Sequence, residues 1–174
     1  VAIRIQRLAD ARDVAVAEDR EHAAEERRAV VVARGREIAD ERLRQALARR
    51  HKLEPAQVVL GNGSTDLIDL LARAFLAPGL NAVISEQAFA RFRQCVNARN
   101  GGAHLVPMRA HTHDLEAMAE AVDARTRLVF LANPNNPTGT WNTRAQVEAL
   151  LDRLPGGVVL VLDEAYFEYA DHAD

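Results

Sequence analysis

The sequence predicts an α/β fold with a mainly parallel sheet and helices on both of its faces. From residue 53 onward, short apolar runs alternate with amphipathic segments, and the apolar runs contain few polar residues. Strands have this character when helices bury them from both sides, as happens in parallel sheets. Ligands bind such sheets beyond the carboxyl ends of the strands, so the polar residues that follow each strand are the candidates for a site.

Each element follows from its local pattern of apolar residues and from the proline and glycine residues that end it. The expected strands are AQVVL (56–60), NAVIS (81–85), AHLVPM (103–108), RLVFLA (127–132) and the apolar run GGVVLVLDEAY (156–166). The expected helices are about 38–51, TDLIDLLARAFLAPG (65–79), FARFRQCVNARNGG (89–102), about 115–122 and TRAQVEALLDRL (143–154).

Composition limits the class of protein. The chain has 174 residues, 48% of them hydrophobic, and a formal net charge of -3, which suits one globular domain and shows no bias toward binding nucleic acid. No apolar stretch approaches the roughly 20 residues of a membrane helix. The single cysteine, Cys95, has no partner for an internal disulfide, and the N-terminus does not resemble a signal peptide. We therefore expect a cytoplasmic protein with no membrane or nucleic-acid partner.

Residues 1–40 differ from the rest, since they contain no proline, no aromatic residue and only one glycine. EDREHAAEERRA (18–29) reads as a solvated helix, and VVVA (30–33) as a short strand or the end of that helix. A surface helix or a poorly ordered arm is the preferred interpretation. The predicted domains are thus a divergent N-terminal segment, 1–40, and an α/β domain, 41–174.

GNGSTD (61–66) lies between an expected strand and an expected helix. Its glycines allow close approach, and Ser64, Thr65 and the free amides of the first helical turn can bind an anion such as phosphate. The alternative is a simple capped turn with Ser64 or Thr65 as the N-cap. This stretch alone favours the capped turn.

DEAYFEY (163–169) places a carboxylate at the end of the most apolar strand. Burial of Asp163 is costly unless it meets a cation or strong donors, so a site and a helix cap by Asp163 or Glu164 are equally good interpretations. HTHD (111–114) contains two histidines and an aspartate, but an ordinary solvated loop with an N-cap is favoured over a metal site.

ANPNNPTG (132–139) follows the strand RLVFLA. Its two prolines fix their own backbone angles and restrict the asparagines that precede them, Asn133 and Asn136. The loop is therefore expected to be stiff and to hold side-chain amides beside the buried acid, where they can position a small polar ligand.

Taken together, GNGSTD, the aromatic Phe89, ANPNNPTG and DEAYFEY resemble pyridoxal-phosphate aminotransferases of fold type I, and most closely the histidinol-phosphate aminotransferases. The resemblance covers roughly residues 42–171 and implies part of the large, cofactor-binding domain. It also implies pyridoxal 5′-phosphate as cofactor, and transamination of histidinol phosphate with 2-oxoglutarate and glutamate in histidine biosynthesis. The implied partners are a small-molecule amino donor and a 2-oxo acid, with a homodimer in the full-length enzyme.

The resemblance also implies that several residues bind the phosphate and the ring of the cofactor. Ser64 and Thr65, with the backbone of Gly63, match the turn that holds its phosphate. Phe89 matches an aromatic ring stacked on the pyridine.

Three further residues match catalytic positions. Asn136 and Tyr166 match the two donors to the pyridine 3-oxygen. Asp163 matches the carboxylate that pairs with the protonated pyridine nitrogen, which keeps the ring able to accept electrons when the substrate α-proton leaves.

The chain also departs from the family pattern. Family members carry a lysine downstream of DEAY that binds the cofactor aldehyde, followed by an arginine and a small C-terminal domain, whereas Lys52, the only lysine here, has no matching position. The Asn-Glu-Asn-Pro and Tyr-Pro segments of the family do not occur in residues 1–41. We therefore expect a fragment that cannot transaminate as given.

Other interpretations stay open. One is another aminotransferase of the same group, acting on an aromatic amino acid or aspartate, or a decarboxylase of a phosphorylated amino acid. A second is a non-catalytic α/β domain that binds a different phosphate compound. A third is a truncated product that does not fold stably because it exposes a sheet edge.

Overall fold

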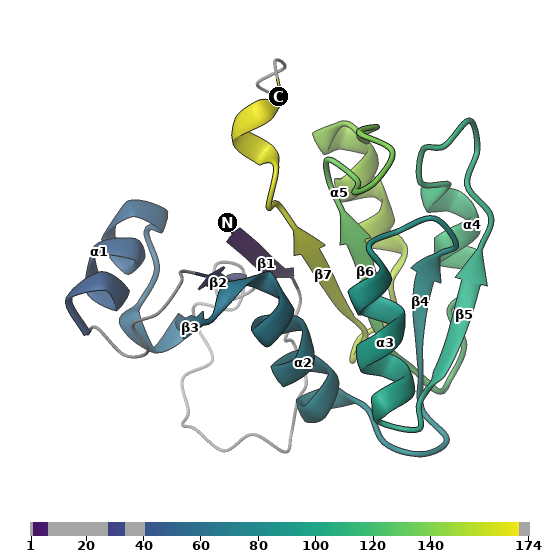
Figure 1. Cartoon of the computed structure of the whole chain (residues 1–174), viewed down its shortest axis with the longest axis horizontal. Coiled ribbons are helices and arrows are strands. Elements are labelled where there is room, and N and C mark those ends of the chain that lie inside the picture. The colour runs from purple at the N-terminus through teal and green to yellow at the C-terminus, as the bar shows by residue number, and fades with distance from the viewer. Residues whose placement is uncertain (1, 7–27, 34–40, 171–174) are drawn as a thin grey trace.

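Seven strands form one sheet in the computed structural model, which describes residues 2–6, 28–33 and 41–170 (Figure 1). Their order across the sheet is β3-β2-β1-β7-β6-β4-β5. The strands are β1 (Ala2–Gln6), β2 (Arg28–Ala33), β3 (Val58–Gly61), β4 (Asn81–Ser85), β5 (Gly102–Val106), β6 (Thr126–Ala132) and β7 (Val159–Asp163).

The sheet is mainly parallel. β1 runs antiparallel to both of its neighbours, β2 and β7, whereas β2–β3, β7–β6, β6–β4 and β4–β5 are parallel pairs. Because β1 is reversed relative to both neighbours, β3 runs in the same direction as β7. The carboxyl ends of β3, β4, β6 and β7 therefore lie along one edge of the sheet, where a ligand is expected.

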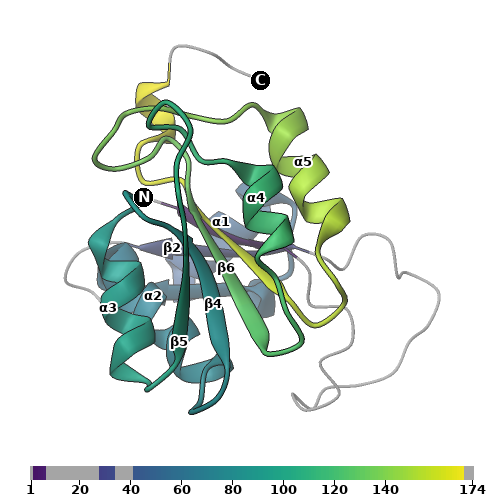
Figure 2. The ribbon, with the colours of Figure 1, turned by 90° about the vertical axis from the view of Figure 1, so that its right-hand side faces the viewer.

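Helices cover both faces, as predicted. α2 (Gly63–Phe75) and α3 (Ala90–Ala98) pack on one face, and α4 (Leu115–Glu120) and α5 (Arg144–Arg153) on the other (Figure 2). α1 (Glu41–His51) lies near β3, at the far end of the sheet from α4 and α5 (Figure 1). No helix in the described ranges is long and apolar enough to cross a bilayer.

β6 shows how an uninterrupted apolar strand forms two cores. Successive side chains of a strand point to opposite faces, so Leu128 and Phe130 face α2 and α3, while Val129 and Leu131 face α4 and α5. All four are fully buried. Phe130 stacks on Phe92 of α3, with ring centroids 4.8 Å apart and planes 18° from parallel, so this face of the sheet is fixed against α3.

Some boundaries differ from the sequence prediction. Residues 28–33, which contain VVVA, form a strand rather than the end of a helix. α1 begins at Glu41, whereas the expected start near residue 38 lies outside the described residues, as does most of the helix expected at 18–29. The division of the chain at residue 40 stays a prediction.

The stacked pair gives a test of the fold. Phe130→Ala should lower the free energy of unfolding by about 3–5 kcal/mol, because it removes a fully buried ring and leaves a cavity beside Phe92. Urea denaturation followed by circular dichroism measures this. The control Leu70→Ala on α2, where the side chain is 43% exposed, should change stability by less than about 1 kcal/mol. A parent chain without a cooperative transition would favour the interpretation that it does not fold stably.

Candidate functional site

A small pocket with a cavity volume of about 40 Å³, open to solvent, lies at the edge of the sheet where β6 and β7 end. The last residues of these strands, Ala132 and Asp163, are paired in register. Five of the seven residues proposed from the sequence line this pocket. The complete lining is Ser64, Phe89, Ala132, Pro134, Asn136, Asp163, Ala165 and Tyr166.

Asp163 is the buried acid of the pocket, only 3% exposed. Its Oδ1 accepts a hydrogen bond from the backbone N–H of Ala165 at 3.1 Å. Burial raises the pKa of its carboxyl group from 3.8 to about 6, although the Ala165 bond works in the opposite direction. A cation in the pocket would favour the ionised form of this acid.

Asp163 and Glu164 do not cap a helix, which was one of the two interpretations of this segment. Asp163 instead accepts from the amide two residues further along the chain. The short helix that follows, Phe167–Tyr169, has Tyr166 at its N-cap position.

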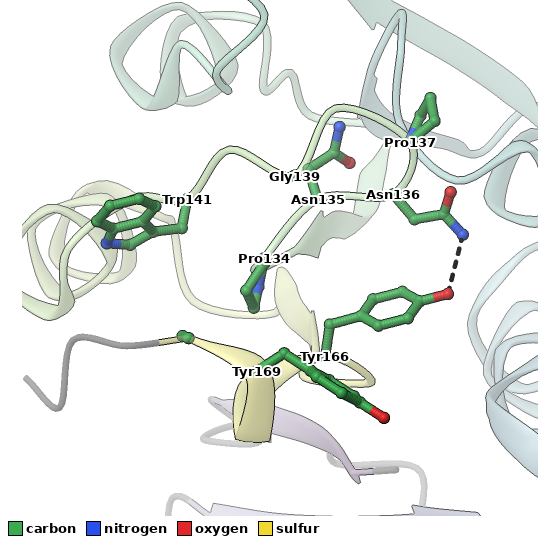
Figure 3. Close-up of a pocket in the computed structure, with 9 residues that line it drawn as sticks. Pro134, Asn135, Asn136, Pro137, Gly139, Trp141, Tyr166 and Tyr169 are labelled. Atoms are coloured by element: carbon green, nitrogen blue, oxygen red, sulfur yellow. Dashed lines mark hydrogen bonds between the residues drawn. The ribbon is translucent and has the colours of Figure 1, made fainter.

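Asn136 and Tyr166 meet at the rim of the pocket. The Asn136 Nδ2 donates to the Tyr166 hydroxyl oxygen at 3.4 Å, and Figure 3 shows the two side chains directed toward each other from the loop and from the segment after β7. This long bond leaves both groups near a common point. A ligand oxygen at that point could accept from both of them.

The other two asparagines of the loop hold the loop itself. The Asn133 Oδ1 accepts from the Asn142 backbone N–H at 2.7 Å, and its Nδ2 donates to the Asn142 carbonyl at 2.9 Å. Asn135, which is 2% exposed, donates to the Gln87 carbonyl at 3.1 Å and to the Thr138 hydroxyl at 2.8 Å. Of the three asparagines, only Asn136 lines this pocket.

The turn after β3 contributes Ser64. α2 begins at Gly63, so Gly63, Ser64 and Thr65 occupy its first three positions, whose N–H groups have no partner within the helix and lie at its positive end. Ser64 is a lining residue, but Gly63 and the exposed Thr65 are not. The N-cap is Asn62, without a side-chain cap bond, so the alternative with Ser64 or Thr65 as the N-cap is wrong.

The two glycines of this turn are needed for different reasons. A Cβ on Gly61 would lie 2.6 Å from Cδ2 of Leu67, so the turn passes too close to α2 for a side chain. Gly63 has open space around it but a φ of +83°, which favours glycine.

Phe89 forms another wall of the pocket. It immediately precedes α3 and is half-buried. Its ring meets that of Phe92 edge to face, with centroids 5.8 Å apart and planes at 84°. This contact fixes the ring orientation, because Phe92 is itself fully buried.

His113 was missed. Asp114 is the N-cap of α4, as expected, and its side chain accepts a hydrogen bond from the Ala117 N–H. His113, however, is only 3% exposed, so the solvated-loop interpretation is wrong for this residue. Burial lowers the pKa of its imidazole, although its bond to the Ala132 carbonyl raises it. The local sequence carries no signal of this burial, because the partners of His113, Ser85 and Ala132, lie far away along the chain.

Metal binding has no support in the described ranges, where no group of three or more His, Cys, Asp or Glu side chains could hold an ion. The chemistry of the pocket therefore rests on one buried acid, two polar groups at its rim, an aromatic wall and a helix N-terminus.

Comparison with known proteins identifies the family of the chain. The family model for aminotransferase class I and II matches residues 7–173. The chain belongs to this family. Two curated relatives of this aminotransferase-family chain are named histidinol-phosphate aminotransferase 2. The one from Pseudomonas aeruginosa is 54% identical over 129 residues, and the one from Methylococcus capsulatus is 51% identical over 143 residues.

A solved structure supports the same assignment. The histidinol-phosphate aminotransferase of Sinorhizobium meliloti, in complex with pyridoxal-5′-phosphate, is 36% identical with a TM-score of 0.71. The match covers 77% of this chain and 38% of that one. Coverage of the two curated relatives is similar, at 74% and 76% of this chain but 35% and 38% of theirs. The chain thus spans little more than a third of the length of these relatives.

The buried acid predicts an unusual pH dependence. The pKa of Asp163 is raised to about 6 in the fold, so its contribution to stability is fully present below its ordinary value of 3.8 and is lost as the pH rises through 6. Asp163→Asn should therefore be more stable than the parent by about 2–3 kcal/mol near pH 8, and this advantage should shrink toward about pH 5.

Urea denaturation at a series of pH values measures the difference. Asp152→Asn, at an exposed position on α5, is the matched control and should show little change at any pH. A lower stability of Asp163→Asn near about pH 8 would show that the carboxylate is satisfied within the fold.

Proposed function

We propose that this pocket binds pyridoxal 5′-phosphate, and that the protein to which the chain belongs transaminates histidinol phosphate with 2-oxoglutarate as amino acceptor. Family membership and the names of the relatives support the activity, and the complex of the Sinorhizobium meliloti enzyme supports the cofactor. The observation that carries the proposal is that one pocket gathers the side chains proposed for it. These are Ser64, Phe89, Asn136, Asp163 and Tyr166.

The buried acid fits the cationic part of this cofactor. The Asp163 carboxylate accepts a hydrogen bond from the Ala165 N–H, yet burial still raises its pKa to about 6. A protonated pyridine nitrogen would supply a positive charge and a hydrogen bond, and such charge-assisted bonds are stronger than neutral ones. Asp163 would hold the ring in its protonated form.

The remaining groups fit the rest of the molecule. Asn136 and Tyr166 would donate to the ring oxygen, and Phe89 would stack on the ring. Ser64 and the first N–H groups of α2 would bind the phosphate, because a helix N-terminus favours negative charge.

When bound, pyridoxal phosphate supplies a protonated ring that withdraws electrons as the substrate loses its α-proton. The residues of this chain bind and orient that ring. Lys52, the only lysine in the sequence, follows α1 and does not line the pocket. We therefore propose that the 174-residue chain holds the cofactor through non-covalent contacts and does not transaminate by itself.

The partners belong to the same proposal. They are a small-molecule amino donor and a 2-oxo acid, and the complete enzyme would act in the cytoplasm as a homodimer. Histidinol phosphate is preferred as the donor because both curated relatives carry its name.

Cofactor binding can be measured with the single tryptophan, Trp141. This side chain lines a neighbouring cavity that shares Asn136 and Tyr166 with the proposed cofactor pocket. Titration with pyridoxal phosphate should quench its fluorescence to saturation. Pyridoxal without the phosphate should bind about tenfold more weakly, because the charge at a helix N-terminus and its hydrogen bonds contribute roughly 1–2 kcal/mol.

Both ligands should be tested on Lys52→Arg, because pyridoxal phosphate also reacts with exposed amines. Asp163→Ala in that background should lose most of the affinity. Equal binding of the two ligands, or binding that disappears with Lys52, would refute a phosphate-recognising pocket.

The substrate requires the complete enzyme. It should convert histidinol phosphate and 2-oxoglutarate with a kcat/KM at least about tenfold above those for aspartate or an aromatic amino acid, a difference of about 1.4 kcal/mol at the transition state. A steady-state assay with this panel measures the preference. A higher kcat/KM for one of the other donors would reassign the substrate and leave the cofactor proposal intact.

A further inference from the structure

Two residues that line the pocket, Phe89 and Asn136, follow neighbouring strands at the same distance from the strand ends. β4 ends at Ser85 and β6 at Ala132, and the two strands are a parallel pair. Phe89 comes four residues after Ser85, and Asn136 four residues after Ala132. Backbone hydrogen bonds fix the separation of the two strands. Beyond the strand ends, other contacts must set the separation of the loop that carries Phe89 and the loop that carries Asn136.

His113 bridges these two strand ends. Its Nε2 lies 2.9 Å from the carbonyl oxygen of Ala132, and its Nδ1 lies 2.7 Å from the hydroxyl of Ser85. The carbonyl can only accept, so in the neutral ring Nε2 carries the proton and Nδ1 is an acceptor. The Ser85 hydroxyl proton then has two possible acceptors, Nδ1 at 2.7 Å and the more weakly accepting Met118 sulfur at 3.3 Å, of which the ring nitrogen is the stronger. His113 and Ser85 are 3% and 1% exposed, so a variant that lost these bonds would leave buried groups unpaired.

The segment that carries His113 also contacts both loops. The His111 Nδ1 lies 3.1 Å from Oε1 of Gln87, two residues before Phe89. The His111 carbonyl accepts from the Thr140 hydroxyl at 2.6 Å, and the His113 carbonyl accepts from Nδ2 of Asn142 at 3.1 Å. One short connection between β5 and α4 therefore contacts the loop of Phe89 and the loop of Asn136 at several points.

The backbone of this connection is strained. Arg109 and Thr112 exchange two backbone hydrogen bonds of 3.0 Å, and the two residues between them, Ala110 and His111, have φ angles of 49° and 61°. Such a turn strongly prefers glycine or asparagine. Contacts elsewhere must offset the strain, and the bonds of His111 and His113 to the two loops are contacts of this kind.

We infer that His113 is a positioning residue, which holds the loops of Phe89 and Asn136 at the separation that the ring of the cofactor requires. This role rests on the proposed function, because it assigns the slot between the loops to that ring. His113 does not line the pocket and acts through Ser85 and Ala132.

The first test needs no cofactor. Hydrogen exchange reports on the Ala88 N–H, bonded to the Ser85 carbonyl, and on the Asn135 N–H, bonded to the Thr140 carbonyl. In the whole 174-residue chain, His113→Leu should speed exchange at both amides at least about tenfold, while the β4 and β6 amides keep their protection. His113→Gln, which can still donate to Ala132, should change these rates less than about threefold.

A control for the loss of a histidine–carbonyl contact elsewhere is available in His104, which is only partly buried. Its Nδ1 also lies 3.0 Å from a backbone carbonyl, that of Ala121, but it belongs to β5 and lies outside the pocket. His104→Leu should leave exchange at Ala88 and Asn135 unchanged. Loss of protection throughout the sheet in His113→Leu would mean a general loss of stability and would overturn the positioning role.

The second test uses pyridoxal phosphate in the Lys52→Arg background. His113→Leu should weaken binding at least about tenfold and reduce the visible circular dichroism of the bound cofactor, which depends on its orientation, and His113→Gln should restore both. Unchanged affinity and dichroism in His113→Leu would refute the inference.

The two tests separate the two proposals. If the parent chain does not bind pyridoxal phosphate but His113→Leu speeds hydrogen exchange at both loops, the cofactor assignment fails and the role of His113 in positioning the loops stands. If the parent binds and His113→Leu leaves exchange at both loops unchanged, the cofactor assignment stands and the role of His113 is refuted.

Discussion

The burial of the Asp163 carboxyl group at the end of β7 is the constraint on which the rest of this site depends. All five residues of β7 are buried, and the strand lies between β1 and β6 inside the sheet. It therefore carries an acidic group into a place where ionisation is unfavourable, as the pKa of about 6 shows. The hydrogen bond from the Ala165 N–H does not offset this cost. This is why we proposed a ligand with a positive charge for a pocket at this position.

Parallel pairing explains why the other walls surround that acid. Ala132 pairs with Asp163, and the ladder continues one residue beyond the strands, where the Asn133 N–H donates to the Asp163 carbonyl at 2.9 Å. The ANPNNPTG loop thus leaves the sheet in a fixed position directly beside the acid. Its own asparagines, Asn133 and Asn135, then hold it to Asn142 and Gln87, which leaves Asn136 directed toward Tyr166.

The sequence predicts those features that depend on local pattern. NAVIS becomes β4 with the predicted bounds, because its apolar run is flanked by chain reversals on both sides. The start of α2 is displaced, since Gly63 and Ser64 join the helix before the Thr65 that the pattern suggested. Of the site, the motifs place an acid, amides and a possible anion turn at strand ends, but the individual roles came from the family resemblance.

What the sequence could not predict is non-local. The strands β1 and β2 pair with partners far along the chain, and β1 is antiparallel in a sheet expected from parallel units. His113 finds its partners 28 and 19 residues away, at Ser85 and Ala132. The spacing of apolar residues along the sequence does not indicate such contacts. A histidine in a polar link has the same local sequence whether it is solvated or buried beneath a pocket.

The pocket therefore combines a rigid backbone with a carboxyl group whose ionisation is unfavourable, and these two properties act together. A ligand that binds only the folded chain stabilises it in proportion to its affinity. If that ligand carries a cation, it also lowers the pKa of Asp163, so that binding and ionisation of this group favour each other. The unfavourable ionisation of Asp163 in the free chain would then be the reason that the pocket prefers a cationic ligand. A loosely held acid would move to solvent and ionise without a partner, so the rigidity supplied by β7 and the loops beside it is what couples protonation to binding.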